Sequence, residues 1–374
     1  MVQVRIPTAR RVRRFCPVVL ALVVAQVGIA WLAGLGIEDS IGFHSPLLEH
    51  PRCAICFYGL PRSFAHLVLP SIRENVLKYN QRCDYFVHYY QVTQEQGGRS
   101  GTGGVLDPTE IEQLRQFVPR IQIVSETDTD FWQARGPLLE HIRSARAKRS
   151  FVKSSRPKNL TNLLYFPVKD LSTHYPTTMD NIVKMWHSQQ AVWNLMERHW
   201  TYDQVAMLRS DVVFTTPITV MSENQTVVVP GFAQYPVNDR MVYGPREAVR
   251  VWASQRFDLL DEHIARIQKE EPGWGMHSER VLHYTIFPKI RSMGYVIYED
   301  PEICFLRART DHSVWLNDCG RDNLTQRRQT VEQLVQHPCR QSWLEQSIKK
   351  RVIQLECDGN NRFLPDDMVT HRPE

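Results

Sequence analysis

The chain has 374 residues, of which 43% are hydrophobic, 10% aromatic and 23% charged. This balance is typical of a globular protein and excludes collagen-like, coiled-coil and wholly disordered chains. The 45 Lys and Arg residues outnumber the 40 Asp and Glu residues by five, and five arginines lie within residues 1–37, which contain no acidic residue. The remainder of the chain is therefore neutral and lacks the basic excess that duplex nucleic acid attracts, so no nucleic-acid partner is expected.

Residues 15–37 are uncharged and predict a transmembrane signal-anchor. As a helix they would extend roughly 34 Å, which exceeds a bilayer core of about 30 Å. The stretch is also longer than the about 7–15 residues of a signal-peptide core, although small residues near Ala30 and Ala33 leave cleavage open. Because arginines precede the span and acidic residues follow it, we expect residues 1–14 to be a cytoplasmic tail and the body to be lumenal. This is the topology of a type II protein of the Golgi or ER membrane.

A lumenal body makes three sequons eligible for N-glycosylation, at Asn159, Asn224 and Asn323. It also permits disulfides among the seven cysteines after the span. Cys56 and Cys304 lie in apolar runs that favour buried thiols, whereas Cys319, Cys339 and Cys357 lie in a polar region where a disulfide is favoured. An odd number of cysteines implies at least one free thiol or an intermolecular bridge.

Strand and helix patterns alternate after a short stem at residues 38–52. Buried strands are predicted over 54–58, 84–90 and 121–124, a helix over 64–79, and a second helix starting at Asp107. The run 94–104 contains five glycines and predicts a flexible loop. The alternation predicts an α/β fold with a mixed, mainly parallel sheet and flanking helices.

The second half of the lumenal domain, residues 53–374, continues the pattern. Residues 143–176 begin with seven basic and no acidic residues over 143–158, and a solvated basic insertion is favoured over a docking or cleavage site. A helix is then predicted over 178–199, a mostly helical segment over 246–269, and strands over 204–208, 226–229 and 295–298. Residues 312–374 form a C-terminal region.

Two strand ends carry candidate chemistry, because ligands of open α/β sheets bind at the carboxyl ends of strands. Gly59 and Pro61 turn the chain after the first strand, and Arg62 could pair with a phosphate or be a surface arginine. Arg209 and Asp211 follow the strand over 204–208. The Asp211 carboxylate could hold Mg²⁺ or Mn²⁺ on a diphosphate, or form a buried ion pair with Arg209.

An ordered set of motifs resembles nucleotide-sugar glycosyltransferases of GT-A type, in particular those that build surface polysaccharides in bacteria and algae. The similarity extends in patches over residues 53–310. It is carried by Cys56-Phe-Tyr-Gly-Leu-Pro-Arg-Ser-Phe64, Ser71-Ile-Arg-Glu-Asn75, Asp84-Tyr-Phe-Val-His88, Lys184-Met-Trp-His-Ser-Gln-Gln190, Arg209-Ser-Asp211 and Asn238-Asp-Arg-Met-Val-Tyr-Gly244.

The resemblance implies a GT-A-like fold and transfer of a sugar from a nucleotide-diphosphate sugar to a glycan or glycoprotein acceptor. It implies that Asp211 binds a divalent cation (Mn²⁺ or Mg²⁺) and the diphosphate, with His312 as a late metal ligand. Many such enzymes have Asp-x-Asp where this chain has Arg-Ser-Asp. Asp239 would face donor or acceptor, and Glu279 would act as the base on the acceptor hydroxyl or as a helix-start carboxylate.

Two other functions fit a lumenal type II protein. Gly59-Leu-Pro-Arg-Ser63 resembles the phosphosulfate loop of sulfotransferases, but bulky Phe64 follows where that loop continues with glycine. A non-catalytic protein that binds glycan or nucleotide is favoured by the missing first carboxylate. Both rank below a glycosyltransferase.

Overall fold

The computed structural model describes residues 52–98, 101–147, 162–167, 175–316, 318–319, 324–334, 340–347 and 350–356. The predicted tail, membrane span and stem lie outside these ranges up to residue 51, as do Asn159, Asn323, Cys339 and Cys357. Within the described ranges, no helix is both long and apolar enough to cross a bilayer.

A seven-stranded sheet forms the centre of the unit over residues 51–374, in the order β10-β8-β9-β6-β1-β2-β5. The strands confirm the predicted mixed and mainly parallel sheet, because β9 alone among these seven runs antiparallel to its neighbours. Their bounds are β1 Cys53–Gly59, β2 Asp84–Tyr90, β5 Gln122–Glu126, β6 Gln204–Arg209, β8 Thr226–Pro230, β9 Met241–Pro245 and β10 Val296–Asp300.

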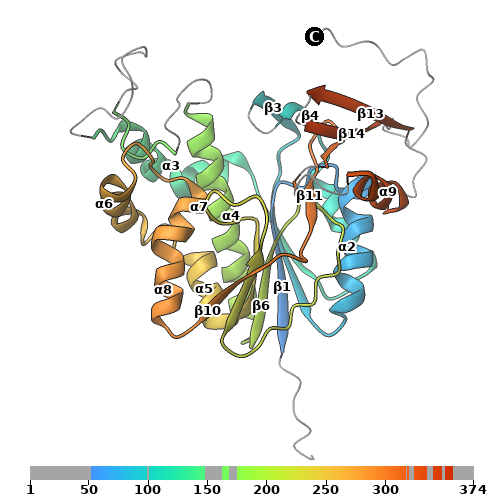
Figure 1. Cartoon of the computed structure of the whole chain (residues 1–374), viewed down its shortest axis with the longest axis horizontal. Coiled ribbons are helices and arrows are strands. Elements are labelled where there is room, and N and C mark those ends of the chain that lie inside the picture. The colour runs from blue at the N-terminus through green and yellow to red at the C-terminus, as the bar shows by residue number, and fades with distance from the viewer. Residues whose placement is uncertain are drawn as a thin grey trace, which may run out of the picture. The chain divides into compact units, whose positions relative to one another are not determined.

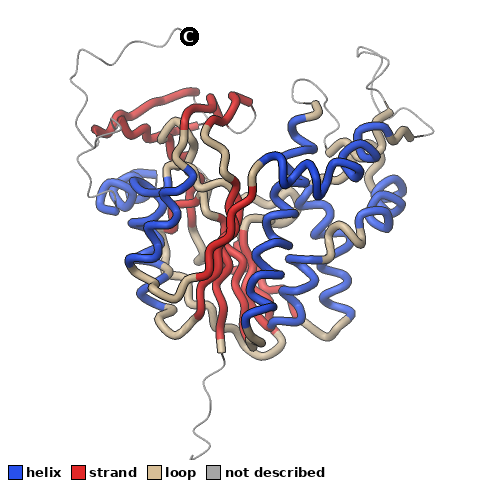
Figure 2. The backbone as a smooth tube through the Cα atoms, turned by 180° about the vertical axis from the view of Figure 1, so that it is seen from behind, coloured by secondary structure: helices blue, strands red, loops and turns tan. Residues whose placement is uncertain are grey.

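Helices cover both faces of this sheet (Figures 1 and 2). One face packs against α4 Thr177–His199, α5 Arg246–Ser254, α6 Leu260–Glu270, and the continuous run of α7 Ser278–Val281, η5 Leu282–Ile286 and α8 Phe287–Ser292. The other face packs against η1 Phe64–Val68, α2 Leu69–Asn75 and η3 Pro108–Gln116, with η2 Leu77–Tyr79 following α2.

Strand β1 shows why the sequence has continuous apolar runs rather than alternation. Its side chains point to opposite faces in turn, so Cys56 and Tyr58 enter the core under α4, whereas Ile55 and Phe57 enter the core under α2. Both faces of the strand are buried, so each position along it must be apolar.

One local prediction is wrong, and the structure adds detail to two other regions. The glycine-rich run 94–104 forms a hairpin of β3 Gln94–Gly98 and β4 Gly101–Val105 rather than a flexible loop. The segment over 246–269, predicted to be mostly helical, forms α5 and α6 with a short break between them. An unpredicted helix, α3 Asp128–Ser144, begins at a capping box in which Thr127 and Asp130 satisfy each other's backbone N–H groups.

Short strands extend the fold beside the main sheet. Strand β7 Val212–Phe214 pairs antiparallel with β11 Phe305–Arg307. Strand β12 Ser313–Trp315 joins β14 Lys350–Glu356, which pairs with β13 Arg340–Ser347, and α9 spans Leu324–Leu334. Of the basic block, Arg143 bonds Asp180 on α4 at 2.7 Å, and residues 148–158 lie outside the described ranges.

Two disulfides join described cysteines, Cys53 to Cys83 and Cys304 to Cys319. The prediction of a buried free thiol is confirmed for Cys56 and wrong for Cys304, whose partner lies in the polar region where a disulfide was expected. The second bridge fastens the turn after β12 to the start of β11.

Candidate functional site

Four chain segments converge at the carboxyl edge of the sheet. Strands β1 and β6 are parallel neighbours, so the residues that follow Gly59 and Arg209 lie at the same edge. Strand β9 is antiparallel and pairs Met241 with Leu208, which brings Asp239 and Arg240 to this edge from the other direction. Strand β11 completes the group, because Arg307 pairs with Val212 directly after the β6 end.

Gly59 makes the turn after β1 possible. Its φ is +106°, a conformation that side-chain-bearing residues rarely adopt. Its N–H donates to Ser188 Oγ at 2.9 Å, and Ser210 Oγ lies 3.7 Å from where a Cβ would be. Pro61 continues the turn, which aims the next side chain, Arg62, across the sheet edge.

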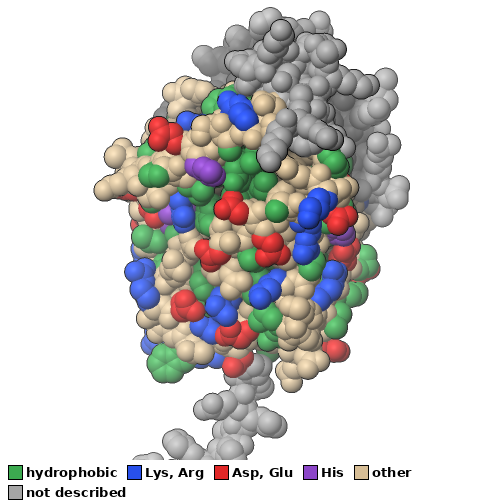
Figure 3. All heavy atoms as spheres, turned by 90° about the vertical axis from the view of Figure 1, so that its left-hand side faces the viewer, with side chains coloured by type: hydrophobic (Ala, Val, Ile, Leu, Met, Phe, Trp, Pro, Cys, Tyr) green, Lys and Arg blue, Asp and Glu red, His purple; other side chains and the backbone are tan. Residues whose placement is uncertain are grey.

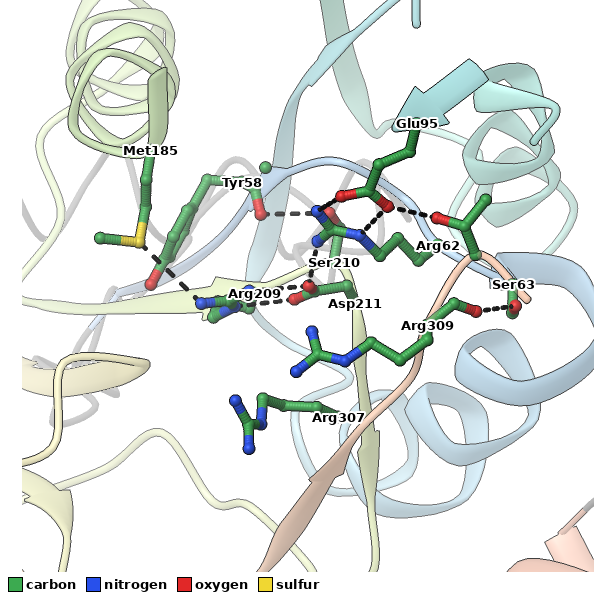
Figure 4. A network of polar contacts seen from close by, with 12 residues as sticks. Tyr58, Arg62, Ser63, Glu95, Met185, Arg209, Ser210, Asp211, Arg307 and Arg309 are labelled. Atoms are coloured by element: carbon green, nitrogen blue, oxygen red, sulfur yellow. Dashed lines mark hydrogen bonds and ion pairs between the residues drawn. The ribbon is translucent and has the colours of Figure 1, made fainter. Parts of the chain in front are cut away.

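Arg62, Arg209 and Asp211, which we predicted as donor-binding residues, form one network (Figure 4). Asp211 Oδ1 accepts from Arg209 Nε at 2.7 Å. Asp211 Oδ2 accepts from Arg209 Nη2 at 2.7 Å and from Arg62 Nη1 at 2.6 Å. Arg62 also donates to both oxygens of Glu95, at 2.7 and 2.5 Å. The structure thus contains the Arg209–Asp211 ion pair that was one of the two predicted alternatives.

The Asp211 side chain is only 3% exposed and is nevertheless held ionised. Burial by itself raises the pKa of this carboxyl, but the guanidinium of Arg209, its hydrogen bonds and the charge of Arg62 outweigh burial. The pKa of Asp211 therefore lies well below its ordinary value.

The arrangement around Asp211 does not fit a divalent cation. Both carboxylate oxygens already accept hydrogen bonds from guanidinium groups, and the positive charges of Arg62 and Arg209 would repel the ion. Across the described ranges, no group of three His, Cys, Asp or Glu residues is placed to hold a metal. We therefore place no cation at Asp211.

His312, the second predicted metal ligand, contacts a different part of the site. Its Nδ1 lies 2.9 Å from Ser63 Oγ, in the turn after β1. Its backbone has φ +59°, and its N–H donates to Arg309 O at 3.0 Å. Burial lowers the pKa of His312, so the imidazole is neutral near pH 7.

Asp239 is buried at the sheet edge rather than exposed to solvent. Burial raises its pKa, but a hydrogen bond from Ser278 and the charges of Arg240, Arg209 and Arg256 outweigh it, so the pKa of Asp239 is lowered. Asp239 is therefore the counter-ion of the arginines on this side of the site.

Ser278 connects Asp239 to the start of α7, where the predicted base lies. Its hydroxyl is 3.2 Å from Trp186 Nε1 and 3.1 Å from Arg256 Nη1. The next residue, Glu279, places Oε2 2.9 Å from His277 Nδ1 and lies within the electrostatic range of Arg256. The structure thus places Glu279 in the first turn of α7, directly after Ser278 and beside His277.

Sequence analysis missed several residues of the site, among them Glu95, Arg307, Arg309 and Asp318. Arg307 donates to both oxygens of Asp318, at 2.7 and 2.6 Å. Arg309 follows two residues later, and the Arg-x-Arg spacing at a strand end was a usable signal. Glu95 had no such signal, since it lies in the glycine-rich run.

Asn224 is the one predicted glycosylation site among the described residues. It lies in an exposed turn before β8, where a glycan could be attached without displacing the core.

The comparisons with known proteins give structural similarity only. No known protein family and no curated protein sequence matches the chain. Mouse xyloside xylosyltransferase 1 is 10% identical with a TM-score of 0.35, and the match covers 66% of this chain and 84% of that one. The glycosyltransferase GlyE of Streptococcus pneumoniae is 10% identical with a TM-score of 0.31, and the match covers 67% of this chain and 46% of that one. The mannosyltransferase PcManGT of Pyrobaculum calidifontis, solved with GDP-Man and Mn²⁺, is 13% identical with a TM-score of 0.30. This match covers 76% of this chain and 66% of that one.

Proposed function

We propose that the protein is a glycosyltransferase that moves a sugar from a nucleotide-diphosphate sugar to a hydroxyl of a glycan or glycoprotein. The observation that carries the proposal is where the charged residues lie. The strands that precede β6 in the chain lie on one side of β1, and β6 and its successors lie on the other. This reversal of strand order is where open α/β sheets bind nucleotides, and Arg62 and Asp211 follow the two strands that flank it.

The residues at this edge suit a glycosyl transfer step. The acceptor oxygen attacks the anomeric carbon, the bond from that carbon to the diphosphate breaks, and the nucleoside diphosphate leaves with the electron pair. Glu279, whose Oε2 lies 2.9 Å from His277 Nδ1, takes the acceptor proton. Guanidinium groups stabilise the negative charge that develops on the leaving diphosphate.

The turn after β1 argues against a sulfotransferase. A phosphosulfate loop needs free backbone N–H groups to wrap the phosphate. Here the N–H of Ala65 donates to Glu110 Oε2 at 2.9 Å, and the side chain of Phe64 is fully buried. A carboxylate thus already occupies the place that a phosphate would need.

We also propose that the described domain is lumenal and anchored by residues 15–37 in the Golgi or ER membrane. The disulfides Cys53–Cys83 and Cys304–Cys319 support this location, because such bridges persist in oxidising compartments.

The test of the transfer reaction uses the purified full-length chain, a panel of nucleotide sugars and a panel of glycan acceptors. Release of nucleoside diphosphate is measured with and without acceptor. Glu279→Gln keeps the shape of the side chain but removes the proton acceptor, so turnover should fall by about 10²–10⁴-fold while donor affinity is retained. Glu140→Gln, which changes an exposed carboxylate on α3, is the matched control and should be fully active.

Two outcomes would contradict the proposal. Normal turnover of Glu279→Gln together with a lower melting temperature would make Glu279 a structural helix-start residue. Nucleotide binding without transfer from any donor would favour the non-catalytic binding protein.

A further inference from the structure

The site contains buried arginines whose positive charge is not matched by carboxylates. Arg309 is 4% exposed and Arg240 is 9% exposed. Among the described residues, Arg309 Nε and Arg240 Nη1 are buried without a hydrogen-bond partner. A buried guanidinium N–H without a partner is costly, so such groups indicate a place where a ligand or water supplies the acceptor.

The neighbouring arginines differ, because carboxylates already hold them. Three of them donate to a carboxylate at 2.5–2.7 Å: Arg307 to Asp318, Arg62 to Glu95 and Arg209 to Asp211. Arg240 and Arg256 share the charge of Asp239, and Arg309 has no carboxylate of its own among its hydrogen bonds. The edge of the sheet is therefore net positive.

Arg309 is fixed in place by the backbone on either side of it. Ala308 N–H donates to Asp211 O at 2.9 Å, and Arg309 N–H donates to Ser313 O at 2.9 Å. Figure 4 shows the guanidinium groups of Arg209, Arg307 and Arg309 ending near one another beside Asp211. Arg307 is 23% and Arg209 is 20% exposed, so solvent reaches the group from their side.

The charge pattern here differs from that of the outer surface. On the face that Figure 3 shows, basic and acidic side chains are interspersed. At the sheet edge, burial and, after it, the charge of Arg307 lower the pKa of Arg309 to about 9. Such a cluster is stabilised by an anion and destabilised by a cation.

We propose that the guanidinium groups of Arg240 and Arg309 bind the donor diphosphate directly, without a divalent cation between Asp211 and the phosphates. The proposal rests on the proposed glycosyl transfer and adds how this chain holds its substrate. Arginine suits the task because its planar N–H groups match pairs of phosphate oxygens. Asp211 then orients Arg62 and Arg209 rather than ligating a metal.

The first experiment measures binding of UDP, GDP, CDP and ADP to the full-length chain by calorimetry, in EDTA and in excess MnCl₂. The nucleotide that binds should do so in EDTA with an affinity within about threefold of that in MnCl₂. Binding only with MnCl₂ would overturn this inference and leave the proposed function standing. The absence of binding in both conditions would overturn the proposed function and this inference with it.

Variants then test the arginines in EDTA. Arg309→Gln should lower the affinity for the nucleotide that binds by at least about tenfold, since a charged hydrogen bond is lost. Arg240→Gln is the second variant, used if Arg309→Gln melts below the assay temperature without ligand. Arg198→Gln, an exposed arginine on α4, is the matched control. Equal affinity of both site variants and this control would overturn the assignment.

Asp211→Asn distinguishes a metal-ligand role of Asp211 from a counter-ion role, because the two roles predict opposite changes in nucleotide affinity. If Asp211 ligates a metal, this variant loses nucleotide affinity in MnCl₂. If Asp211 is a counter-ion, the variant frees two guanidinium groups, and affinity in EDTA should be equal to or higher than that of the wild type. A loss of affinity confined to MnCl₂ would overturn the inference.

Discussion

Asp211→Asn should also destabilise the fold by an amount that the network predicts. The substitution keeps the side-chain volume but removes the charge that accepts three hydrogen bonds, two from Arg209 and one from Arg62. Removing one partner of a fully buried ion pair costs about 3–5 kcal/mol. Arg62 keeps Glu95, and Arg209 is one-fifth exposed, so water compensates part of the loss. We therefore expect the free energy of unfolding to fall by about 2–4 kcal/mol.

Urea denaturation followed by tryptophan fluorescence measures this loss, in a double-mutant cycle with Arg62→Met. The cycle should give a coupling of about 1–3 kcal/mol, because both residues belong to one hydrogen-bonded network. Asp258→Asn, an exposed carboxylate, is the control and should stay within about 0.5 kcal/mol of wild type. A loss below about 1 kcal/mol in Asp211→Asn, or no coupling to Arg62, would refute the argument that Asp211 holds the two guanidinium groups.

Three further predictions concern the rest of the domain. Burial lowers the pKa of His263 to about 4, below its value in the unfolded chain. The free energy of unfolding should therefore fall by on the order of 3 kcal/mol as pH falls from about 6.5 to 4, and His263→Gln should flatten this pH dependence. Cys319→Ser opens the bridge to Cys304 and should lower stability by roughly 3 kcal/mol, whereas an unchanged urea midpoint would contradict the bridge. Glycosidase should reduce the apparent mass of cell-expressed protein, and Asn224→Gln should reduce that shift; no shift, together with cytosolic protease access, would contradict a lumenal domain.

The sheet was predictable because its strands are buried on both faces. Residues 54–58, 84–90 and 204–208 are apolar at nearly every position, and the structure pairs all three as parallel neighbours. The same logic placed Arg62 and Asp211 together, since each directly follows one of these strands. Local sequence was therefore sufficient to predict the position of residues that follow directly after a strand.

Long-range contacts were not predictable in this way. The hairpin over 94–105 looked like a flexible loop because its glycines carry no local pattern, yet Glu95 bonds both Arg62 and Thr310, which lie far away in the chain. Likewise the family resemblance implied that His312 is a metal ligand, whereas its ring nitrogen Nδ1 lies 2.9 Å from Ser63 Oγ. These outcomes depend on which turns face one another at the sheet edge, and no single segment encodes that.

Residue 209, where this chain has Arg in place of the first Asp of an Asp-x-Asp motif, changes the charge of the site. Many enzymes that the motifs resemble have a carboxylate at this position, and this chain has Arg209. Exchanging a carboxylate for a guanidinium changes the local charge by two units, which is the charge that a divalent cation would bring. Arg209 therefore makes the position next to Asp211 attractive to phosphate without an ion, and it also makes the site repel one. On this argument Arg209→Asp should reverse the preference, so that nucleotide binding is lost in EDTA and restored in part by MnCl₂; binding in EDTA equal to wild type would show that residue 209 does not set the charge of the site.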